Sequence, residues 1–276
     1  MATALPSRLG FGVSGALATP LVTARAAGAL ISAAFEGGVR VFDTAPAYGA
    51  GEAERRLGRA LAALPRDQVC LTTKAGLFSF GLRGRRRDFS PGAIEASVRA
   101  SLERLGVDGV DALFLHGPAP GELTNALMTR LSELKAAGAF AALGVCGRGA
   151  EIEEAIEAGA GEIVMAPVHP FLNAEEAARI ERVRAGGAAL LAIETAGDGP
   201  PGFRAPRRPA DLYPLAKRLV ADGPGRGRVD VEAGLRFALE CADAALFTTT
   251  RRAHLTANLA AAGEAGGGSG RRRPAR

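Results

Sequence analysis

The chain has 276 residues, of which 47% are hydrophobic and 23% are charged, and its formal net charge is +5. This balance is typical of a globular protein and argues against a disordered one, while no apolar run reaches the roughly eighteen residues that a membrane span needs. Arg271, Arg272, Arg273 and Arg276 lie in a Gly-rich C-terminal stretch, and without them the net charge is +1, so no basic nucleic-acid-binding face is expected.

Short apolar runs alternate with longer amphipathic segments along the chain. The apolar runs predict strands at residues 9–13, 39–43, 69–74, 111–115, 142–146, 163–166, 188–193 and 244–248. The amphipathic segments predict helices at residues 20–35, 52–63, 123–137, 151–158, 174–184, 211–221, 231–239 and 253–262. Ser90 and Pro91 predict a further helix that Ser90 caps. The arginine cluster Arg83, Arg85, Arg86 and Arg87 is expected to be a solvated loop, the alternative being a contact with an anionic ligand or partner.

Strands that alternate with helices predict a parallel sheet built from βαβ units. Eight such units indicate an α/β fold of the (β/α)8 TIM-barrel type, for which about 250 residues is typical. We expect one barrel domain over residues 1–262 and a disordered Gly/Arg-rich tail over residues 263–276. The alternative is a doubly wound sheet, because Gly10, Gly12 and Gly15 have the spacing of a dinucleotide-binding turn. The second strand runs into a Pro/Tyr loop instead of presenting a ribose-binding acid, which favours the barrel.

Four scarce or charged residues lie at the ends of three successive strands: Asp43, Tyr48, Lys74 and His116. The chain has only two tyrosines and three histidines. In a barrel the carboxyl ends of the strands meet at one face, so these side chains should converge there. Each also has a structural explanation: Asp43 could cap a loop, Tyr48 could pack in a turn, Lys74 could reach the rim, and His116 could be a core histidine.

Together, the four side chains suit protonation of a carbonyl oxygen. A tyrosine hydroxyl is a proton donor at neutral pH, and a lysine cation beside it lowers its pKa. Asp43 can keep Lys74 charged, and a neutral His116 can orient the carbonyl. These groups supply no hydride, so a bound cofactor must.

The cysteines Cys70, Cys146 and Cys241 are far apart and form no CxxC motif. A zinc site or a disulfide framework is therefore not expected, and a reducing cytoplasm fits. The N-terminus has no long apolar segment typical of a secretory signal.

The segment Phe42-Asp-Thr-Ala-Pro-Ala-Tyr-Gly-Ala-Gly-Glu52 resembles the signature of the aldo-keto reductases. Thr73-Lys74, Ser101-Leu-Glu-Arg-Leu-Gly106 and Leu115-His116 follow in that family's order. The resemblance implies a (β/α)8 barrel that reduces aldehydes or ketones, or oxidises the corresponding alcohols or sugars. It implies NADPH as the cofactor, with NADH as the alternative. It implies Asp43, Tyr48, Lys74 and His116 as the catalytic residues and a small carbonyl or alcohol substrate. No set of metal ligands is evident in the sequence, so no metal is expected.

The resemblance weakens in the second half of the chain. It implies cofactor binding by a segment near the C-terminus that contains Thr248, Thr249, Arg252, His254 and Asn258. At the positions where the family contacts the nicotinamide, this chain has Cys146, Gly147, Met165 and Ile193, so we expect a loosely held nicotinamide. The alternative function is a catalytically weakened barrel that acts as a binding or regulatory subunit.

Overall fold

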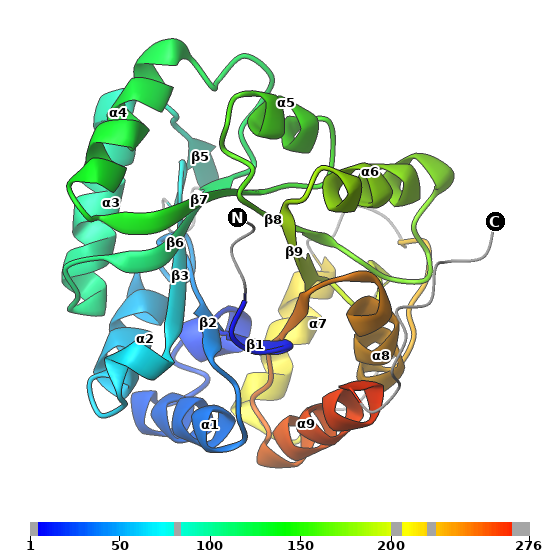
Figure 1. The fold of residues 1–276 in the computed structure, drawn as a ribbon. Helices are drawn as coiled ribbons and strands as arrows, with labels where there is room; N and C mark the ends of the chain where they lie inside the picture. Colours follow the sequence, from blue (N-terminus) through cyan, green and yellow to red (C-terminus); the bar gives the residue numbers. More distant parts are fainter. Residues whose placement is uncertain (1–4, 80–83, 200–205, 220–224, 267–276) are drawn as a thin grey trace.

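The computed structural model describes residues 5–79, 84–199, 206–219 and 225–266. Within them, eight parallel strands close into a barrel surrounded by helices (Figure 1). The order around the barrel is β1, β10, β9, β8, β7, β6, β3 and β2. The barrel strands are β1 (Leu9–Gly12), β2 (Val41–Asp43), β3 (Cys70–Ala75), β6 (Val110–His116), β7 (Phe140–Cys146), β8 (Ile163–Pro167), β9 (Ala189–Ile193) and β10 (Ala244–Phe247). The predicted (β/α)8 fold is confirmed.

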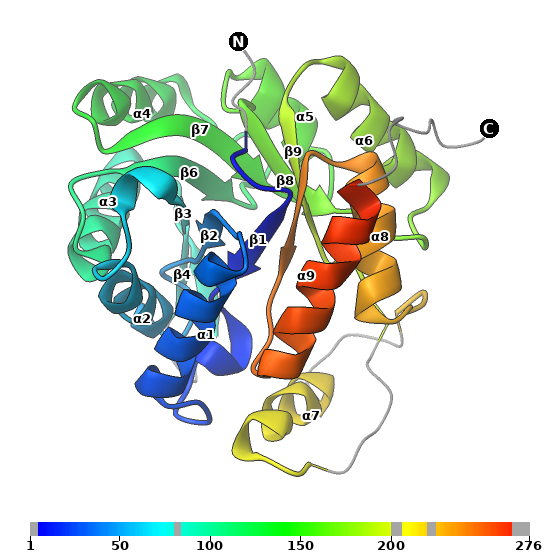
Figure 2. The same cartoon turned by 60° about the horizontal axis from the view of Figure 1, so that its bottom comes forward.

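The helices lie outside the barrel, and α1 packs beside both α2 and α9, which completes the ring (Figure 2). They are α1 (Ala24–Glu36), α2 (Glu52–Leu61), α3 (Pro91–Leu105), α4 (Asn125–Ala136), α5 (Glu151–Glu157), α6 (Ala174–Ala185), α7 (Leu212–Leu219), α8 (Val231–Cys241) and α9 (Arg252–Gly266). None of the described helices is long and apolar enough to cross a membrane. Because α7 lies at the end where the strands finish, it belongs to the face that carries the site (Figure 2).

Three helix ends differ clearly from the sequence prediction. Helix α1 begins at Ala24, four residues after its expected start at residue 20, because Thr23 accepts from the N–H of Ala26 and caps the helix there. Ser90 precedes α3, but its hydroxyl donates to Asp88 Oδ1 at 2.7 Å and makes no capping hydrogen bond to the helix. Helix α9 continues to Gly266, four residues beyond its expected end at residue 262. Most of the expected tail, residues 267–276, lies outside the described part of the chain.

The arginine-rich segment contains a hairpin that the sequence analysis did not predict. β4 (Leu77–Ser79) pairs antiparallel with β5 (Arg85–Arg87). The three arginines of β5 are exposed, as expected, whereas Arg83 lies outside the described residues. The prediction of a loop was wrong here because a strand whose side chains are all solvated has no apolar alternation to reveal it.

Two apolar layers hold the barrel together. Alternate strand residues fill its interior, including Val41, Phe114, Met165 and Leu191, while the residues between them pack outward against the helices. Side chains along a strand alternate between its two faces, so the residue two positions after an inward-facing one also faces inward. This alternation puts Asp43 after Val41 and His116 after Phe114 on the inner face, at the carboxyl end of the barrel.

Candidate active site

A buried ion pair between Lys74 and Asp43 forms the base of the site. Lys74 Nζ donates to Asp43 Oδ2 at 2.5 Å and to the carbonyl oxygen of Thr44 at 2.9 Å, and Thr72 Oγ1 donates to Asp43 Oδ1 at 2.8 Å. Burial alone would lower the pKa of Lys74, but the Asp43 carboxylate raises it above its ordinary value. Burial raises the pKa of Asp43, and the Lys74 ammonium opposes that rise. Because Asp43 accepts two hydrogen bonds, we assign it the charged form.

Tyr48 lies in the turn between β2 and α2, above this pair. Its ring is edge-on to the ring of His116, with centroids 6.1 Å apart, and Lys74 Nζ lies 5.3 Å from the centroid of the Tyr48 ring. Burial raises the pKa of the Tyr48 phenol, and the Lys74 charge acts against this rise. Lys74 acts to lower this pKa, as expected from the sequence, but burial outweighs it. The phenol is therefore protonated at neutral pH.

His116 closes β6 and stands opposite Cys146 of β7 in the strand register. Burial lowers the pKa of His116 to about 3, and the charges of Lys74, Arg85 and Arg148 act in the same direction. Its Nδ1 is buried and has no hydrogen-bond partner within the described residues. The imidazole is therefore neutral and carries one N–H that can donate to a substrate oxygen.

A buried carboxylate in the first turn of α2 anchors the helix that follows the Tyr48 turn. Glu54 is fully buried; its Oε1 accepts from Thr73 Oγ1 at 2.7 Å and its Oε2 accepts from Arg104 Nε at 2.6 Å. Gly49 in the turn has φ +60°, and a Cβ there would lie 2.2 Å from the carbonyl oxygen of Ala18. Only glycine fits this position without a shift of the Ala18 backbone.

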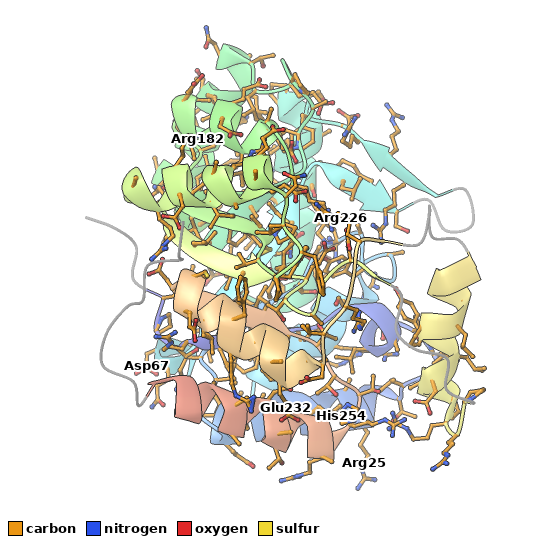
Figure 3. All side chains as sticks on the ribbon, turned by 90° about the vertical axis from the view of Figure 1, so that its right-hand side faces the viewer. Arg25, Asp67, Arg182, Arg226, Glu232 and His254 are labelled. Carbon is orange, nitrogen blue, oxygen red and sulfur yellow. The ribbon has the colours of Figure 1, made fainter. Side chains whose placement is uncertain are left out.

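The residues expected to bind the adenosine end of a cofactor follow β10 and continue into α9. Thr248 Oγ1 donates to the carbonyl oxygen of Gly12 at 2.8 Å, and Thr249 Oγ1 accepts from the N–H of residue 251 at 3.1 Å. Arg252 and His254 are exposed, whereas Asn258 is buried. Figure 3 shows His254 on α9, well separated from Arg226 beside α6. This segment runs into the N-terminus of α9, and the N-terminus of a helix suits a phosphate group.

Contacts that the sequence did not indicate tie this segment to the region before α7. Arg251 Nη2 donates to both carboxylate oxygens of Asp211, at 3.0 and 3.1 Å. Arg208 Nη1 donates to the carbonyl oxygen of Thr250 at 3.0 Å. Residues 208 and 211 lie in or beside a Pro/Gly/Arg loop without periodicity, so no pattern could identify them. Arg251 is thus engaged with Asp211, while Arg252 faces solvent.

The ends of β7, β8 and β9 present an apolar surface beside the tetrad Asp43, Tyr48, Lys74 and His116. Cys146 and Met165 are register neighbours and are buried, and Ile193 packs against the same cluster. Burial raises the pKa of the Cys146 thiol to about 11, so the thiol is neutral. Gly147 follows, and a Cβ there would lie 2.7 Å from Glu151 Oε1.

An ion pair that the sequence analysis missed lies at the same strand ends. Arg148 Nη2 donates to Glu194 Oε1, and Arg148 Nε donates to Glu194 Oε2 at 3.3 Å. The two residues are 46 positions apart, so no local pattern joins them; the available signal was their place just beyond two strand ends.

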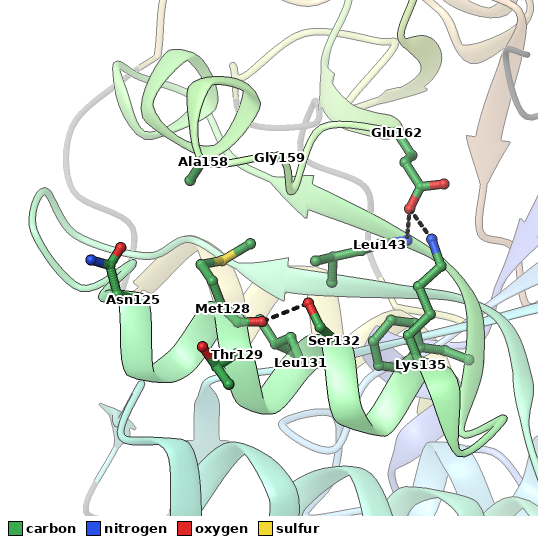
Figure 4. A pocket seen from close by; sticks show the side chains of 11 residues that line it. Asn125, Met128, Thr129, Leu131, Ser132, Lys135, Leu143, Ala158, Gly159 and Glu162 are labelled. Atoms are coloured by element: carbon green, nitrogen blue, oxygen red, sulfur yellow. Dashed lines mark hydrogen bonds and ion pairs between the residues drawn. The ribbon is translucent and has the colours of Figure 1, made fainter.

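Two cavities lie near the barrel wall. The larger, of about 520 Å³, is on the outer flank between α4, β7 and α5, where Lys135 Nζ donates to Glu162 Oε1 at 2.6 Å (Figure 4). It contains none of the tetrad. The smaller, of about 220 Å³, is at the carboxyl end of β8 and β9 and includes Arg148, His169 and Glu194 in its lining. No group of three His, Cys, Asp or Glu side chains in the described ranges is placed to hold a metal ion.

The family model described as "Aldo/keto reductase family" matches residues 8–200. The chain belongs to the aldo/keto reductase family. The matched residues run from β1 past β9 and include the whole tetrad, whereas β10 and α9 lie beyond them.

Relatives of this aldo/keto reductase include enzymes of different named activities. A D-threo-aldose 1-dehydrogenase of a Pseudomonas species is 36% identical over 139 residues, 42% of each chain. An aldo-keto reductase of Mycolicibacterium smegmatis is 31% identical over 237 residues, 83% of this chain and 74% of the relative. An NADH-specific methylglyoxal reductase of Escherichia coli is 35% identical over 142 residues, 47% of this chain and 44% of the relative. The first and third matches thus span less than half of those relatives.

Solved structures share the fold over nearly the whole chain. A structure from Pseudomonas aeruginosa, described as an aldo-keto reductase, has a TM-score of 0.72 and 26% identity, and covers 94% of this chain and 90% of that one. An aldo-keto reductase of Klebsiella pneumoniae in complex with NADPH has a TM-score of 0.67 and 21% identity, and covers 92% of this chain and 84% of that one. The second likeness establishes the shared barrel alone.

Proposed function

We propose that this aldo/keto reductase transfers a hydride between a nicotinamide cofactor and a small aldehyde or ketone, or the corresponding alcohol or sugar. Tyr48 is the general acid in reduction and the general base in oxidation. The observation that carries the proposal is the grouping of Tyr48, His116 and Lys74 at the carboxyl end of the barrel, with the two rings 6.1 Å apart and the ammonium 5.3 Å from the phenol ring.

In the reductive direction, the substrate oxygen accepts hydrogen bonds from the Tyr48 hydroxyl and from the N–H of His116. The nicotinamide, when bound, supplies the hydride to the carbonyl carbon. As negative charge develops on the oxygen, Tyr48 gives up its proton, and the Lys74 ammonium stabilises the phenolate that forms. Asp43 keeps Lys74 charged and in place. A neutral His116 suits this role because it orients the oxygen without competing for the proton.

We propose NADPH as the preferred cofactor, with NADH as the second choice. Thr248, Thr249, Arg252, His254 and Asn258 are the residues that would hold its adenosine end. Arg252 is exposed at the start of α9, where a guanidinium suits a 2′-phosphate. The NADPH complex of the Klebsiella pneumoniae structure agrees with this choice, whereas the name of the Escherichia coli relative points to NADH.

The second candidate is a barrel that binds a ligand or regulates a partner without turnover. The apolar side chains Cys146, Met165 and Ile193 favour it, because they offer no hydrogen bonds to a carboxamide. A failure to bind NADPH or NADH in a titration followed by nicotinamide fluorescence would favour this second candidate, because a reductase needs the dinucleotide. The chain has no tryptophan, so the signal comes from the cofactor.

The substitution Tyr48→Phe tests the reductase. It keeps the ring and removes the proton donor, so kcat should fall by about two to four orders of magnitude while the Kd for NADPH stays nearly unchanged. Stopped-flow reduction of a small aldehyde and a fluorescence titration measure the two quantities. A Tyr48→Phe enzyme with the parent's kcat would exclude Tyr48 as the acid.

A further inference from the structure

The Arg148–Glu194 ion pair bridges the ends of two strands that are not neighbours. Arg148 follows β7 and Glu194 follows β9, and β8 lies between them in the barrel. Two donor atoms of Arg148 engage both carboxylate oxygens of Glu194. Glu194 has φ 53°, a left-handed conformation that residues other than glycine rarely adopt. The carboxylate is thus held beyond the end of β8, between β7 and β9, on a residue of uncommon backbone geometry.

This pair lies beside the place where the reacting carbonyl would sit. His116 stands opposite Cys146 in the register, and Arg148 follows Cys146 by two residues. The Arg148 charge acts on both His116 and Cys146. A ring that passes a hydride to a carbonyl held by Tyr48 and His116 must lie next to them. The neighbouring strand ends carry an apolar floor of Cys146, Met165 and Ile193, of which Cys146 and Met165 are buried.

The carboxamide on such a ring needs polar partners, which the floor does not supply. A carboxamide has an accepting carbonyl oxygen and a donating NH₂ group. Arg148 has N–H groups beyond the two that it gives to Glu194, and the Glu194 oxygens have further lone pairs. The pair is neutral overall, as the carboxamide is. We infer that Arg148 and Glu194 bind the carboxamide of the nicotinamide, Arg148 as donor and Glu194 as acceptor; this inference rests on the proposed function.

Binding measurements with and without the nicotinamide test the role of Arg148. Arg148→Met removes the donors and keeps an aliphatic stem, so the Kd for NADPH should rise about ten- to a hundredfold. The Kd for 2′-phospho-ADP-ribose, which lacks the nicotinamide, should stay within about twofold of the parent's. Arg99→Met is the matched control, because it removes an exposed arginine of α3 whose Nη2 donates to Glu95 at 2.6 Å. It should bind both ligands as the parent does.

A cofactor analogue tests Glu194 separately. In the 3-acetylpyridine analogue of NADPH, a methyl group replaces the NH₂ group, so this ligand cannot donate to Glu194. Glu194→Ala should weaken NADPH binding about tenfold and leave binding of the analogue unchanged. The losses of binding free energy caused by Glu194→Ala and by replacement of the NH₂ group should therefore not be additive.

Three results would overturn the inference. Unchanged NADPH binding in both variants would mean that other groups hold the carboxamide. Equal weakening of NADPH and 2′-phospho-ADP-ribose would mean that the pair only shapes the barrel mouth. If the folded parent binds neither NADPH nor NADH, the proposed function fails as well, which separates that failure from the first two.

Discussion

At the scale of single residues, the site depends on two opposite charges that stabilise each other in a buried place. Lys74 and Asp43 are 1% and 4% exposed, and within the described residues neither hydrogen-bonds to another residue of opposite charge. Removing one partner of a buried ion pair costs more than replacing both, because it leaves a charge without compensation.

The first residue-scale prediction follows from this coupling. Lys74→Met should lower the free energy of unfolding by about 3–5 kcal/mol, and Asp43→Asn combined with Lys74→Met should recover most of that loss. Turnover should stay lost by orders of magnitude in both, and any residual activity should show a higher apparent pKa, because Lys74 acts to lower the pKa of Tyr48. Urea unfolding and a pH–rate profile measure these effects. A double variant that regains turnover would remove Lys74 from the mechanism.

The neutral state of His116 gives a prediction on stability against pH. Its pKa is about 3 when folded and ordinarily about 6.5, so the unfolded chain binds the proton first as the pH falls. The neutral His116 contributes its full share to the free energy of unfolding above about pH 6.5. Between about pH 6.5 and pH 3 this contribution falls by about 1.4 kcal/mol for each unit of decrease in pH. Between pH 7.5 and pH 5.0 the loss should be about 2 kcal/mol in urea unfolding.

His169 complicates the measurement because burial also lowers its pKa. His116→Gln removes the ionisable group at one position and leaves His169 in place, so the variant should lose less stability than the parent over the same pH interval. If parent and variant show the same dependence on pH, His116 is not the group responsible.

The same scale shows which site residues the sequence could reveal. Asp43, Tyr48, Lys74 and His116 are scarce residues at strand ends, so their convergence follows from the barrel alone. Thr72 could have been found as well, because it precedes Lys74 by two residues and therefore shares its face. Arg148 and Glu194 also lie just beyond strand ends, but their contact could not be predicted because it depends on the left-handed backbone of residue 194.

At the scale of elements, the alternation of strands and helices was predictable because the spacing of apolar residues differs between strands and helices. The spacing of apolar residues does not indicate how closely α2 and α3 approach each other. Gly58 of α2 faces Leu105 at the end of α3, and a Cβ at residue 58 would lie 2.4 Å from the carbonyl oxygen of Leu105. From the sequence alone, this glycine is only an unfavourable helix residue.

Gly58→Ala should therefore destabilise the protein although alanine is the better helix former. The backbone of Leu105 would have to move, and we expect the free energy of unfolding to fall by about 1–3 kcal/mol. Gly28→Ala in α1 is the matched control, because a Cβ at residue 28 has no neighbour within 4 Å. That change should be stabilising by up to about 1 kcal/mol. Equal effects of the two substitutions in urea unfolding would contradict the close packing of α2 on α3.

At the scale of the whole molecule, the barrel closes through β1 and β10, which lie at opposite ends of the chain. Thr248 Oγ1 donates to the carbonyl oxygen of Gly12 across 236 positions of sequence. The count of eight strands predicted this closure. It could not predict that the loop after β10 is tied to Asp211 before α7, because that contact joins two segments without periodicity. The expected nucleotide segment is therefore part of the structure that closes the barrel.

A ligand bound to that segment should stabilise the whole fold, which gives the last prediction. A ligand that binds only the folded state adds about 2.7 kcal/mol to the free energy of unfolding at a hundred times its Kd. For a chain of this length, that gain corresponds to a rise in Tm of about 5–10 °C. If Arg252 contacts a 2′-phosphate, NADPH should raise Tm more than NADH does at the same concentration. Circular dichroism is suitable, because the chain has no tryptophan to report unfolding.

The variants decide which group makes the distinction. Arg252→Ala should reduce the NADPH shift to the size of the NADH shift and leave the latter unchanged, because only the contact to the extra phosphate is lost. Arg99→Ala, far from the segment on α3, should keep the parent's difference. Equal shifts with NADPH and NADH in the parent would mean that Arg252 does not read the phosphate. A difference that disappears in Arg251→Ala but persists in Arg252→Ala would assign the role to Arg251, which would then have to leave Asp211 when NADPH binds.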